Sequence, residues 1–324
     1  MKRFTRAVAA LVFVCSFGAP EAGAQAFPER TVTLVVPYAA GGLPDTVARV
    51  VGQKLGEKWG QAVVVENKPG GNGTVSAQYL ATKAPDGYTL QVTDGTMFSV
   101  NPWIYKKLSY DPIKDFTFIS LTARAPLFLA VPPSFPANNF AEFVKEVKAN
   151  PGKYSYGSSG IGSIHHLTTE AMKAALGLDL LHVPYKGTGQ SVPAVVGNQV
   201  SAVFSAIPSL AGFVKEGKLK LIAVNTAQRS GLAPEIQTVA ENGVPGFDFA
   251  PIIGFTGPAG MSPALAEKIS RDVAEVVKDP AIKERLHVLG IDAVGSTPQE
   301  YAAQIVNDKA RFEKAVAIAG AKAD

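Results

Sequence analysis

The chain alternates short apolar runs with segments in which apolar residues recur every three or four positions. Residues 31–37 read TVTLVVP, a short β-branched run that is typical of a buried strand. Helical spacing follows from Pro44 to Lys58, with one apolar face formed by Val47, Val50, Val51 and Leu55. A strand at 62–66, a helix at 74–83 and a strand at 89–93 continue the pattern. This alternation predicts an α/β fold with a mostly parallel sheet.

The alternation starts again after an extended stretch at 116–131 that is broken at 124–126. The pattern predicts helices at 141–149, 163–176, 189–196 and 210–216, and strands at 154–158, 179–183, 200–205 and 219–225. Three more helices are expected near 263–277, 281–289 and 299–318.

Two α/β units without a flexible linker are either tandem or interleaved. The extended stretches near 120–131 and 219–226 resemble strands that pass between two lobes. We therefore expect residues 27–124 and 226–324 to form lobe 1, with residues 125–225 inserted as lobe 2.

The first 26 residues have the layout of a secretory signal peptide. A basic start with Lys2, Arg3 and Arg6 precedes the apolar run 7–17, and small residues lead up to Ala26. The apolar run is far shorter than the roughly 20 residues of a membrane span, which disfavours the alternative of a membrane anchor. We expect cleavage near Ala26 and export to the periplasm of a bacterium.

Composition excludes several other classes. The 324 residues are 47% hydrophobic and 18% charged, which is an ordinary globular composition. Cys15 is the only cysteine and lies within the signal, so neither a disulfide framework nor a cysteine zinc site is available. Residues 27–324 carry 28 basic and 26 acidic residues, a net charge of +2. Without a Lys/Arg-rich stripe, no nucleic-acid partner is expected.

A first candidate ligand turn follows the strand at 31–37. Gly41 and Gly42 let the backbone approach a ligand closely, and Pro44 suits the first turn of the helix that follows. A helix N-terminus carries unpaired N–H donors and a partial positive charge, so it suits an anion. The alternative is a plain strand-to-helix connection. Asp45 is expected to be mainly structural, bonding loop N–H groups and pairing with Arg49 at i,i+4.

A second candidate turn runs from Ser158 to Ser163 and has the same strand–turn–helix order. Ser163 is a plausible N-cap of the following helix. His165 lies off the buried face of that helix, so it is either a site residue or a solvated imidazole. For His166 a structural hydrogen bond near the turn is favoured.

The third candidate turn is Val183–Gly189, where Lys186 is the one cation found in the three turns. Lys186 contacts either a ligand or solvent. Ligands bind at the carboxyl ends of strands in open α/β sheets, and between two lobes such ends converge.

Catalytic motifs do not account for these turns. Residues 157–162 have the glycine spacing of a phosphate loop, but Ser163 stands where its lysine is needed. Neither a G-x-S-x-G elbow nor a His-Glu-x-x-His motif occurs. We expect neither an enzyme nor a cofactor or metal site.

At these turns the chain resembles the Bug-type receptors, the extracytoplasmic solute-binding proteins of tripartite tricarboxylate transporters. The resemblance is carried by the first turn with Asp45 and Arg49, and by residues 65–73, 84–88, 110–116, 156–167 and 183–187. It continues through 217–219, Arg229, 241–243 and 257–260, so it covers nearly all of the chain after the signal.

The resemblance implies a two-lobed periplasmic-binding-protein fold of type II, with crossover strands as the hinge and a carboxylate held between the lobes. It also implies transient contact with membrane transporter subunits, and we expect a monomer. Together with the turns, it gives these candidate ligand-binding residues: Tyr38, Ala40, Gly41, Gly42, Asp45, Thr93, Thr96, Ser158, Gly162, Ser163, His165, Tyr185, Lys186, Ser205 and Ala206.

Two segments depart from the expected pattern. The strand end Thr93–Phe98 has an unusual sequence and could line the far end of the ligand. Ser205 stands where relatives often have an acidic residue. Both departures bear on the ligand's identity. The alternatives to a transport receptor are a sensing subunit for a membrane kinase and a hydrolase that uses His165 and a serine.

Overall fold

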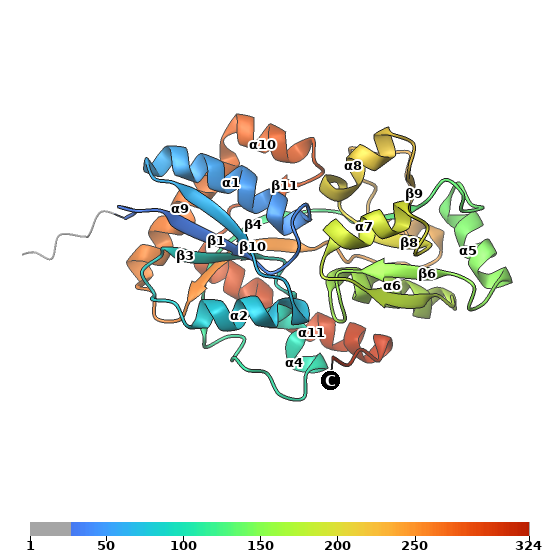
Figure 1. Ribbon diagram of the computed structural model, residues 1–324, viewed down its shortest axis with the longest axis horizontal. Coiled ribbons are helices and arrows are strands. Elements are labelled where there is room, and N and C mark those ends of the chain that lie inside the picture. The colour runs from blue at the N-terminus through green and yellow to red at the C-terminus, as the bar shows by residue number, and fades with distance from the viewer. Residues whose placement is uncertain (1–26, 324) are drawn as a thin grey trace, which may run out of the picture.

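Two β-sheets form the centre of the fold, and the computed structural model describes residues 27–323 around them (Figure 1). The first sheet has the strand order β11-β4-β10-β3-β1-β2. Its strands are β1 Val32–Val36, β2 Val63–Asn67, β3 Thr89–Thr93, β4 Phe116–Arg124, β10 Ile252–Pro258 and β11 Asp292–Ala293. The second sheet has the order β7-β6-β8-β5-β9. Its strands are β5 Phe128–Val131, β6 Ser155–Ser158, β7 Leu181–Pro184, β8 Ala202–Ser205 and β9 Lys220–Val224.

Helices cover each sheet, and each sheet with its helices forms a lobe. Lobe 1 holds α1 Leu43–Trp59, α2 Thr74–Ala81, α3 Thr96–Ser99, α4 Asn101–Ile104, α9 Pro263–Lys278, α10 Pro280–His287 and α11 Pro298–Ala319, with the 3-10 turn η1 Gly71–Gly73. Lobe 2 holds α5 Phe140–Ala149, α6 Ile164–Leu176, α7 Thr188–Val196 and α8 Ile207–Lys215, and η2 Ala240–Asn242 follows β9 in the chain. The two-lobed α/β architecture predicted from the sequence is confirmed.

Local signals explain where the helices next to the candidate turns begin. The Ser163 side chain accepts a hydrogen bond from the His166 amide at 3.3 Å and caps α6, as predicted. Proline stands in the first turn of α1, as expected. Helix α8 begins at Ile207, three residues before the predicted start, because Pro208 suits the first turn of a helix.

The sheets are mixed, so the expectation of a mostly parallel sheet was wrong. Strand β10 runs antiparallel to β3 and β4, and β5 runs antiparallel to β8 and β9. The chain enters β5 and β10 after crossing from the other sheet, so these strands point away from the interface between the lobes. Strands β1, β3, β6 and β8 end at that interface.

A buried asparagine joins the segments that cross between the lobes. The Asn225 Oδ1 atom accepts from the Leu127 amide at 2.7 Å, and its Nδ2 donates to the Phe249 carbonyl at 2.9 Å. Its own amide donates to the Leu127 carbonyl at 2.9 Å. Asn225 is fully buried, and its bonds hold the segments just before β5 and β10 at the end of β9.

The segment that follows the expected boundary at residue 226 still pairs with the second sheet. The Val224 amide donates to the Gln237 carbonyl at 3.0 Å, and the Val239 amide donates to the Val224 carbonyl at 3.0 Å. Residues 237–239 therefore extend the second sheet beside β9. Backbone pairing with the first sheet begins again near Pro251, whose carbonyl accepts from the Ala125 amide at 3.2 Å.

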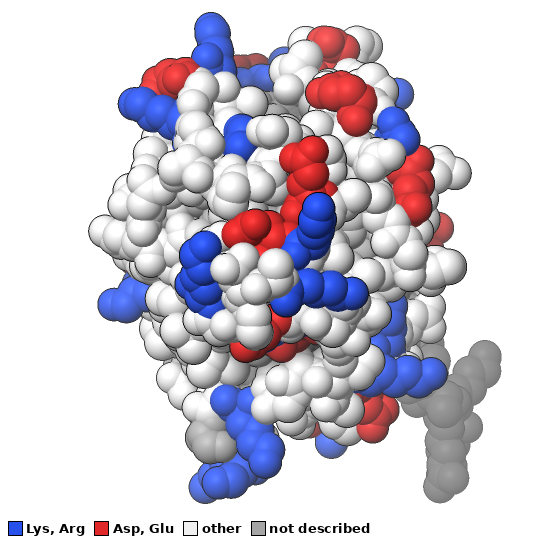
Figure 2. Space-filling model, turned by 90° about the vertical axis from the view of Figure 1, so that its right-hand side faces the viewer, with Lys and Arg blue, Asp and Glu red and all other residues white. Residues whose placement is uncertain are grey.

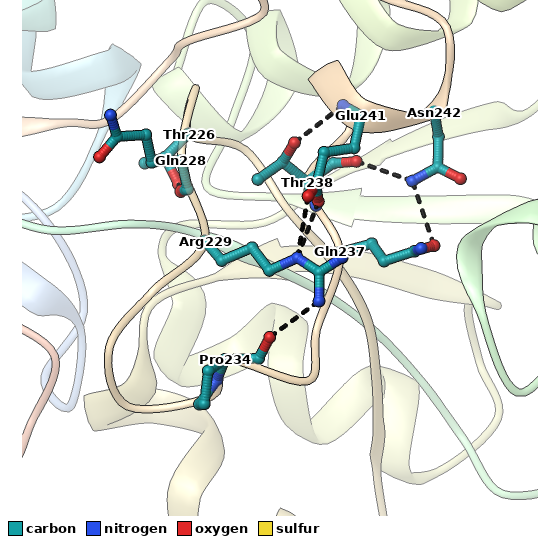
Figure 3. Close-up of polar contacts among 8 residues, drawn as sticks. All are labelled: Thr226, Gln228, Arg229, Pro234, Gln237, Thr238, Glu241 and Asn242. Atoms are coloured by element: carbon teal, nitrogen blue, oxygen red, sulfur yellow. Dashed lines mark hydrogen bonds and ion pairs between the residues drawn. The ribbon is translucent and has the colours of Figure 1, made fainter.

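An ion pair shapes this returning segment (Figure 3). The Arg229 Nε atom donates to both carboxylate oxygens of Glu241, at 2.9 and 3.0 Å, and Arg229 Nη1 donates to the Pro234 carbonyl at 3.0 Å. Glu241 also accepts from the Thr238 amide at 2.7 Å. Because Thr238 lies next to β9, these contacts hold the segment against lobe 2.

Among residues 27–323, no helix is long and apolar enough to cross a membrane. The predicted signal peptide and its cleavage after Ala26 lie outside the described residues. On the end of lobe 2 drawn in Figure 2, Lys and Arg are interspersed with Asp and Glu. That face therefore offers no extended surface of one charge.

Candidate functional site

The three predicted turns meet between the lobes and border a cavity of about 250 Å³. The first turn follows β1, the second follows β6 and the third follows β7. Strands β6 and β7 are parallel neighbours, so their carboxyl ends lie side by side. Lobe 1 lines the cavity with Pro37, Tyr38, Gly70, Gly71, Asn72, Tyr105 and Ala323, and lobe 2 with Ser159, Gly160, Ile161, Pro184, Tyr185 and Lys186.

The first turn is held by a buried polar cluster within lobe 1. The Tyr38 hydroxyl lies 3.0 Å from Asp94 Oδ1, to which it donates, and 3.0 Å from Thr96 Oγ1. Burial and the nearby Asp94 carboxylate raise the pKa of Tyr38 well above its usual value, so the phenol is neutral. Burial also raises the pKa of Asp94, while hydrogen bonds from Thr96 and Tyr38 oppose that effect. Tyr38 therefore presents a fixed ring to the cavity.

Asp45 makes the structural contacts that the sequence predicted. Its carboxylate accepts from the Gly41 amide at 3.0 Å, from Arg49 Nε and Nη2 at 2.9 Å each, and from Asn67 Nδ2 at 3.0 Å. Burial on its own would raise the pKa of Asp45, but the hydrogen bonds from Arg49, Gly41 and Asn67 lower it below its usual value. The carboxylate is thus charged and fixes the backbone of the first turn.

Three imidazoles lie behind the second turn, and each contacts one of its residues. His182 Nε2 lies 2.6 Å from Ser158 Oγ, and His165 Nδ1 lies 3.0 Å from Ser159 Oγ. His166 Nδ1 accepts from the Gly162 amide at 3.1 Å, which confirms the structural hydrogen bond predicted for His166. The His166 and His182 rings stack with centroids 4.1 Å apart.

Burial keeps these imidazoles neutral. His165 is 8% exposed, which excludes the alternative of a solvated imidazole. Burial lowers the pKa of His165 to about 4. Burial, with a contribution from Lys173, lowers the pKa of His166 to about 4, and burial together with His166 lowers the pKa of His182 to about 3. At neutral pH each ring therefore offers one donor and one acceptor nitrogen.

Several amides that the sequence offered as anion donors are bonded within the protein. The Gly41 amide donates to Asp45, the Gly162 amide donates to His166, and the Gly160 amide donates to Ser158 Oγ at 3.0 Å. Gly162 is buried, where N–H groups nearly always find a partner, and polar side chains beside the turns also bond the amides of exposed Gly41 and half-buried Gly160. The Ser158 hydroxyl is likewise engaged, between His182 and Gly160.

The two lobes touch directly at the mouth of the cavity. The Ala39 amide donates to the Lys186 carbonyl at 3.3 Å, and Ser209 Oγ donates to the Gly41 carbonyl at 2.8 Å. A Cβ added at Gly189 would lie 2.1 Å from the Ala40 carbonyl oxygen. These contacts describe a closed cleft in which glycine is needed on the lobe 2 side.

Of the predicted ligand-binding residues, Tyr38, Tyr185 and Lys186 line the cavity. Ala40, Gly41, Gly42, Gly162, Ser163 and His165 lie in or behind the bordering turns. Thr93 ends β3 and Ser205 ends β8, and the hydroxyls of both are buried without a hydrogen-bond partner among the described residues. Thr96 contacts Tyr38 and Asp94, and Ala206 is the N-cap of α8.

Sequence reasoning missed several residues of the cavity. Ser159 and Gly160 belong to the second turn but were not selected. Gly70, Gly71 and Asn72 lie in a glycine-rich turn that the sequence marks, although nothing local assigns it to a ligand. Tyr105 and Ala323 carry no sequence signal. Ala323 reaches the cavity only because the C-terminal segment packs beside α4, where the Ala323 amide donates to the Ile104 carbonyl.

A larger cavity of about 510 Å³ lies on the returning segment beside Arg124 and Pro126. Its walls mix cations and anions, including Arg124, Asp248 and Asp292, and Arg229 is already paired with Glu241. The smaller cavity fits the candidate site better because residues of all three predicted strand-to-helix turns line it.

Comparison with known proteins agrees with this geometry. Residues 47–320 match the family model described as the tripartite tricarboxylate transporter family receptor. The chain is 36% identical over 282 residues to a UPF0065 protein of Bordetella pertussis, an alignment that covers 87% of each chain.

Three solved structures are similar along nearly their whole length, each at 31% identity. A Rhodopseudomonas palustris protein with adipate has a TM-score of 0.88, with 91% of this chain and 99% of that chain covered. MatC from the same organism with bound malate has a TM-score of 0.82, covering 90% and 100%. The periplasmic binding protein BugD has a TM-score of 0.86, covering 91% and 99%.

Proposed function

The chain belongs to the receptor family of tripartite tricarboxylate transporters, a family of solute-binding proteins, and on this premise we propose that it captures a small organic acid in the cavity between Tyr38 and Ser159. The observation that carries this proposal is the cavity of about 250 Å³ at strand ends of both lobes. Drug-sized pockets are typically about 300–1,000 Å³, so a short ligand is favoured. The adipate and malate named for two relatives are short dicarboxylates and serve as the first ligands to test.

The walls of the cavity suit one end of such an anion. Lys186 is the single cation among the lining residues, and the Ser159 hydroxyl lies on the same side. The α1 and α6 N-termini adjoin the cavity and favour negative charge by roughly 0.3–1 kcal/mol each. Thr93 and Ser205 are not among the residues that line the cavity, but their buried hydroxyls at the strand ends lack a partner among the described residues and are candidates for the distal end of a longer ligand.

Calorimetry with adipate and malate, followed by a crystal structure of the complex, tests the site. We expect the carboxylate between the turns Tyr38–Gly42 and Ser158–Ser163. Lys186→Met should weaken binding about tenfold, as expected for loss of a charge-assisted contact. Lys215→Met, at the end of α8 in the same lobe, is the matched control and should bind normally. A carboxylate located away from both turns would refute the site.

Capture of the ligand requires the lobes to open. Lobe 1 is proposed to comprise residues 27–124 and about 250–323, with residues 125 to about 249 as lobe 2, since residues 237–239 extend the second sheet. The hinge is then placed at 124–127, Asn225 and 249–251. A ligand that contacts both lobes only when they are closed shifts the population to the closed form. Small-angle scattering should show a smaller radius of gyration with saturating ligand.

The proposal also covers where the protein works and what happens to its ligand. The receptor works in the periplasm as a monomer and passes its ligand to membrane subunits of the transporter. The exported protein should begin at Phe27, which mass spectrometry of a periplasmic extract measures directly.

Two further observations separate the receptor from its alternatives. Incubated adipate and malate should be recovered intact, and a new product would favour an enzyme. Adjacent genes for membrane transporter subunits would favour transport over sensing.

A further inference from the structure

Ser159 and His165 form a buried pair at the wall of the cavity. Ser159 lines the cavity and is 5% exposed, while His165 lies directly behind it in the first turn of α6. The two side chains meet through Ser159 Oγ and His165 Nδ1 at 3.0 Å. The proton in this contact is either the single hydroxyl proton of the serine or an imidazole proton, and the two cases differ in what the serine offers to a ligand.

Resting on the proposed binding of an organic acid, we infer that His165 is a positioning residue whose Nδ1–H donates to Ser159 Oγ, so that the Ser159 hydroxyl donates its own proton to the ligand carboxylate. In the opposite arrangement Ser159 gives its proton to Nδ1, and its oxygen presents lone pairs to the cavity. Lone pairs repel an anion, so that arrangement opposes binding of a carboxylate. The inferred arrangement makes Ser159 a donor that discriminates in favour of anionic groups.

The neighbouring histidine provides an internal reference, because its tautomer is fixed by the backbone. The Gly162 amide can only donate, so His166 Nδ1 must accept and the proton of this ring must lie on Nε2. Adjacent residues of one helix are therefore inferred to hold opposite tautomers, with His165 protonated on Nδ1 and His166 protonated on Nε2.

Burial keeps both rings neutral, so each carries one N–H, and His166 accepts at Nδ1 only in this neutral form. The titratable groups beside His166 and His182 are Tyr156 on β6 and Glu170 and Lys173 on α6. Glu170 accepts from the Tyr156 hydroxyl at 2.5 Å and from Lys173 Nζ at 2.6 Å, so its carboxylate is already paired. Neither ring has a carboxylate partner of its own among the contacts of the described residues.

Nitrogen NMR on histidine-labelled protein at pH 7 tests the inference without any ligand. The chain has four histidines, so single substitutions assign the signals. We expect His165 to show the Nδ1–H tautomer and His166 the Nε2–H tautomer. If His165 shows the Nε2–H tautomer, Ser159 donates to it and the inference is overturned.

Calorimetry with adipate and malate gives the second test, as a double-mutant cycle. His165→Leu and Ser159→Ala should each weaken binding about tenfold. Because both remove the same contact, the Kd of the double variant should not exceed the higher of the two single-variant Kd values. His165→Asn, whose amide can donate at the position of Nδ1, should retain most of the affinity. The control His287→Leu, on α10 of lobe 1, should bind normally. Additive losses, or none, would overturn the inference.

The two tests separate this inference from the proposed function. If the wild-type protein binds neither adipate nor malate, the proposed function fails for these ligands, and the tautomer measurement still decides the arrangement of the pair. If the wild-type protein binds and the variants bind equally well, the inference alone fails. Thermal unfolding of each variant shows whether the fold is retained, and if His165→Leu does not fold, Ser159→Ala and the tautomer measurement decide.

Discussion

Replacing Gly189 with alanine should prevent full closure of the cleft. The new Cβ would lie 2.1 Å from the Ala40 carbonyl oxygen of the opposite lobe, more than an ångström closer than an ordinary van der Waals contact. Because the obstructing atom belongs to the backbone, no change of side-chain rotamer relieves the contact, and the lobes must separate instead.

The expected change in apparent Kd follows from the free energy by which the new contact destabilises the closed form. Overpacking costs about 1–3 kcal/mol, and here the cost falls on the closed form alone. Since ligand contacts both lobes only in that form, the apparent Kd should rise by about 5- to 150-fold. The open form should lose no stability, because alanine is favoured over glycine in helices by up to about 1 kcal/mol.

Calorimetry and small-angle scattering with adipate and malate measure the two consequences. Gly189→Ala should bind weakly and should not reach the compact radius of gyration of the liganded wild-type protein. Gly212→Ala is the matched control, since it also adds a Cβ to a lobe 2 helix but meets nothing within 4 Å. Wild-type affinity and compaction in Gly189→Ala would show that the Ala40 contact has no part in ligand binding.

Three further substitutions test the supports of the site. Asp45→Ala should lower the free energy of unfolding by about 1–3 kcal/mol in denaturant melts, because it removes the buried carboxylate that accepts from Gly41, Arg49 and Asn67. Asn225→Leu should cost at least about 2 kcal/mol and should raise hydrogen exchange at Leu127, whereas unchanged exchange there would contradict the role of Asn225 at the crossings. Stability should fall as the pH drops from about 6.5 towards 3. In this range the histidines of the unfolded chain bind protons, whereas the buried imidazoles of the folded chain, with pKa values of about 3 to 4, stay neutral. His182→Phe should reduce that pH slope in urea melts at pH 7, 5 and 4, and an unchanged slope would assign acid sensitivity to other groups.

The sequence alone predicted the family, the two-lobed α/β fold and the local elements beside the site. The N-cap of α6 and the contact of Asp45 with Arg49 join residues within four positions of one another. Such features depend on hydrophobic periodicity and on side chains close in the chain, and both can be read directly from residue order.

Tertiary structure decided which residues face the cavity and how their donors are used. Tyr105 and Ala323 reach it from segments more than 200 residues apart, and Asn225 joins strands that local patterns leave unrelated. The direction of β5 and β10 depends on where the chain crosses between sheets, so the mixed sheets escaped prediction. The sequence offered the Gly41 and Gly162 amides as free donors for an anion, but in the structure they donate to Asp45 and His166. The physical reason is that buried polar groups must find partners in three dimensions, and residue order alone does not determine which groups folding brings together.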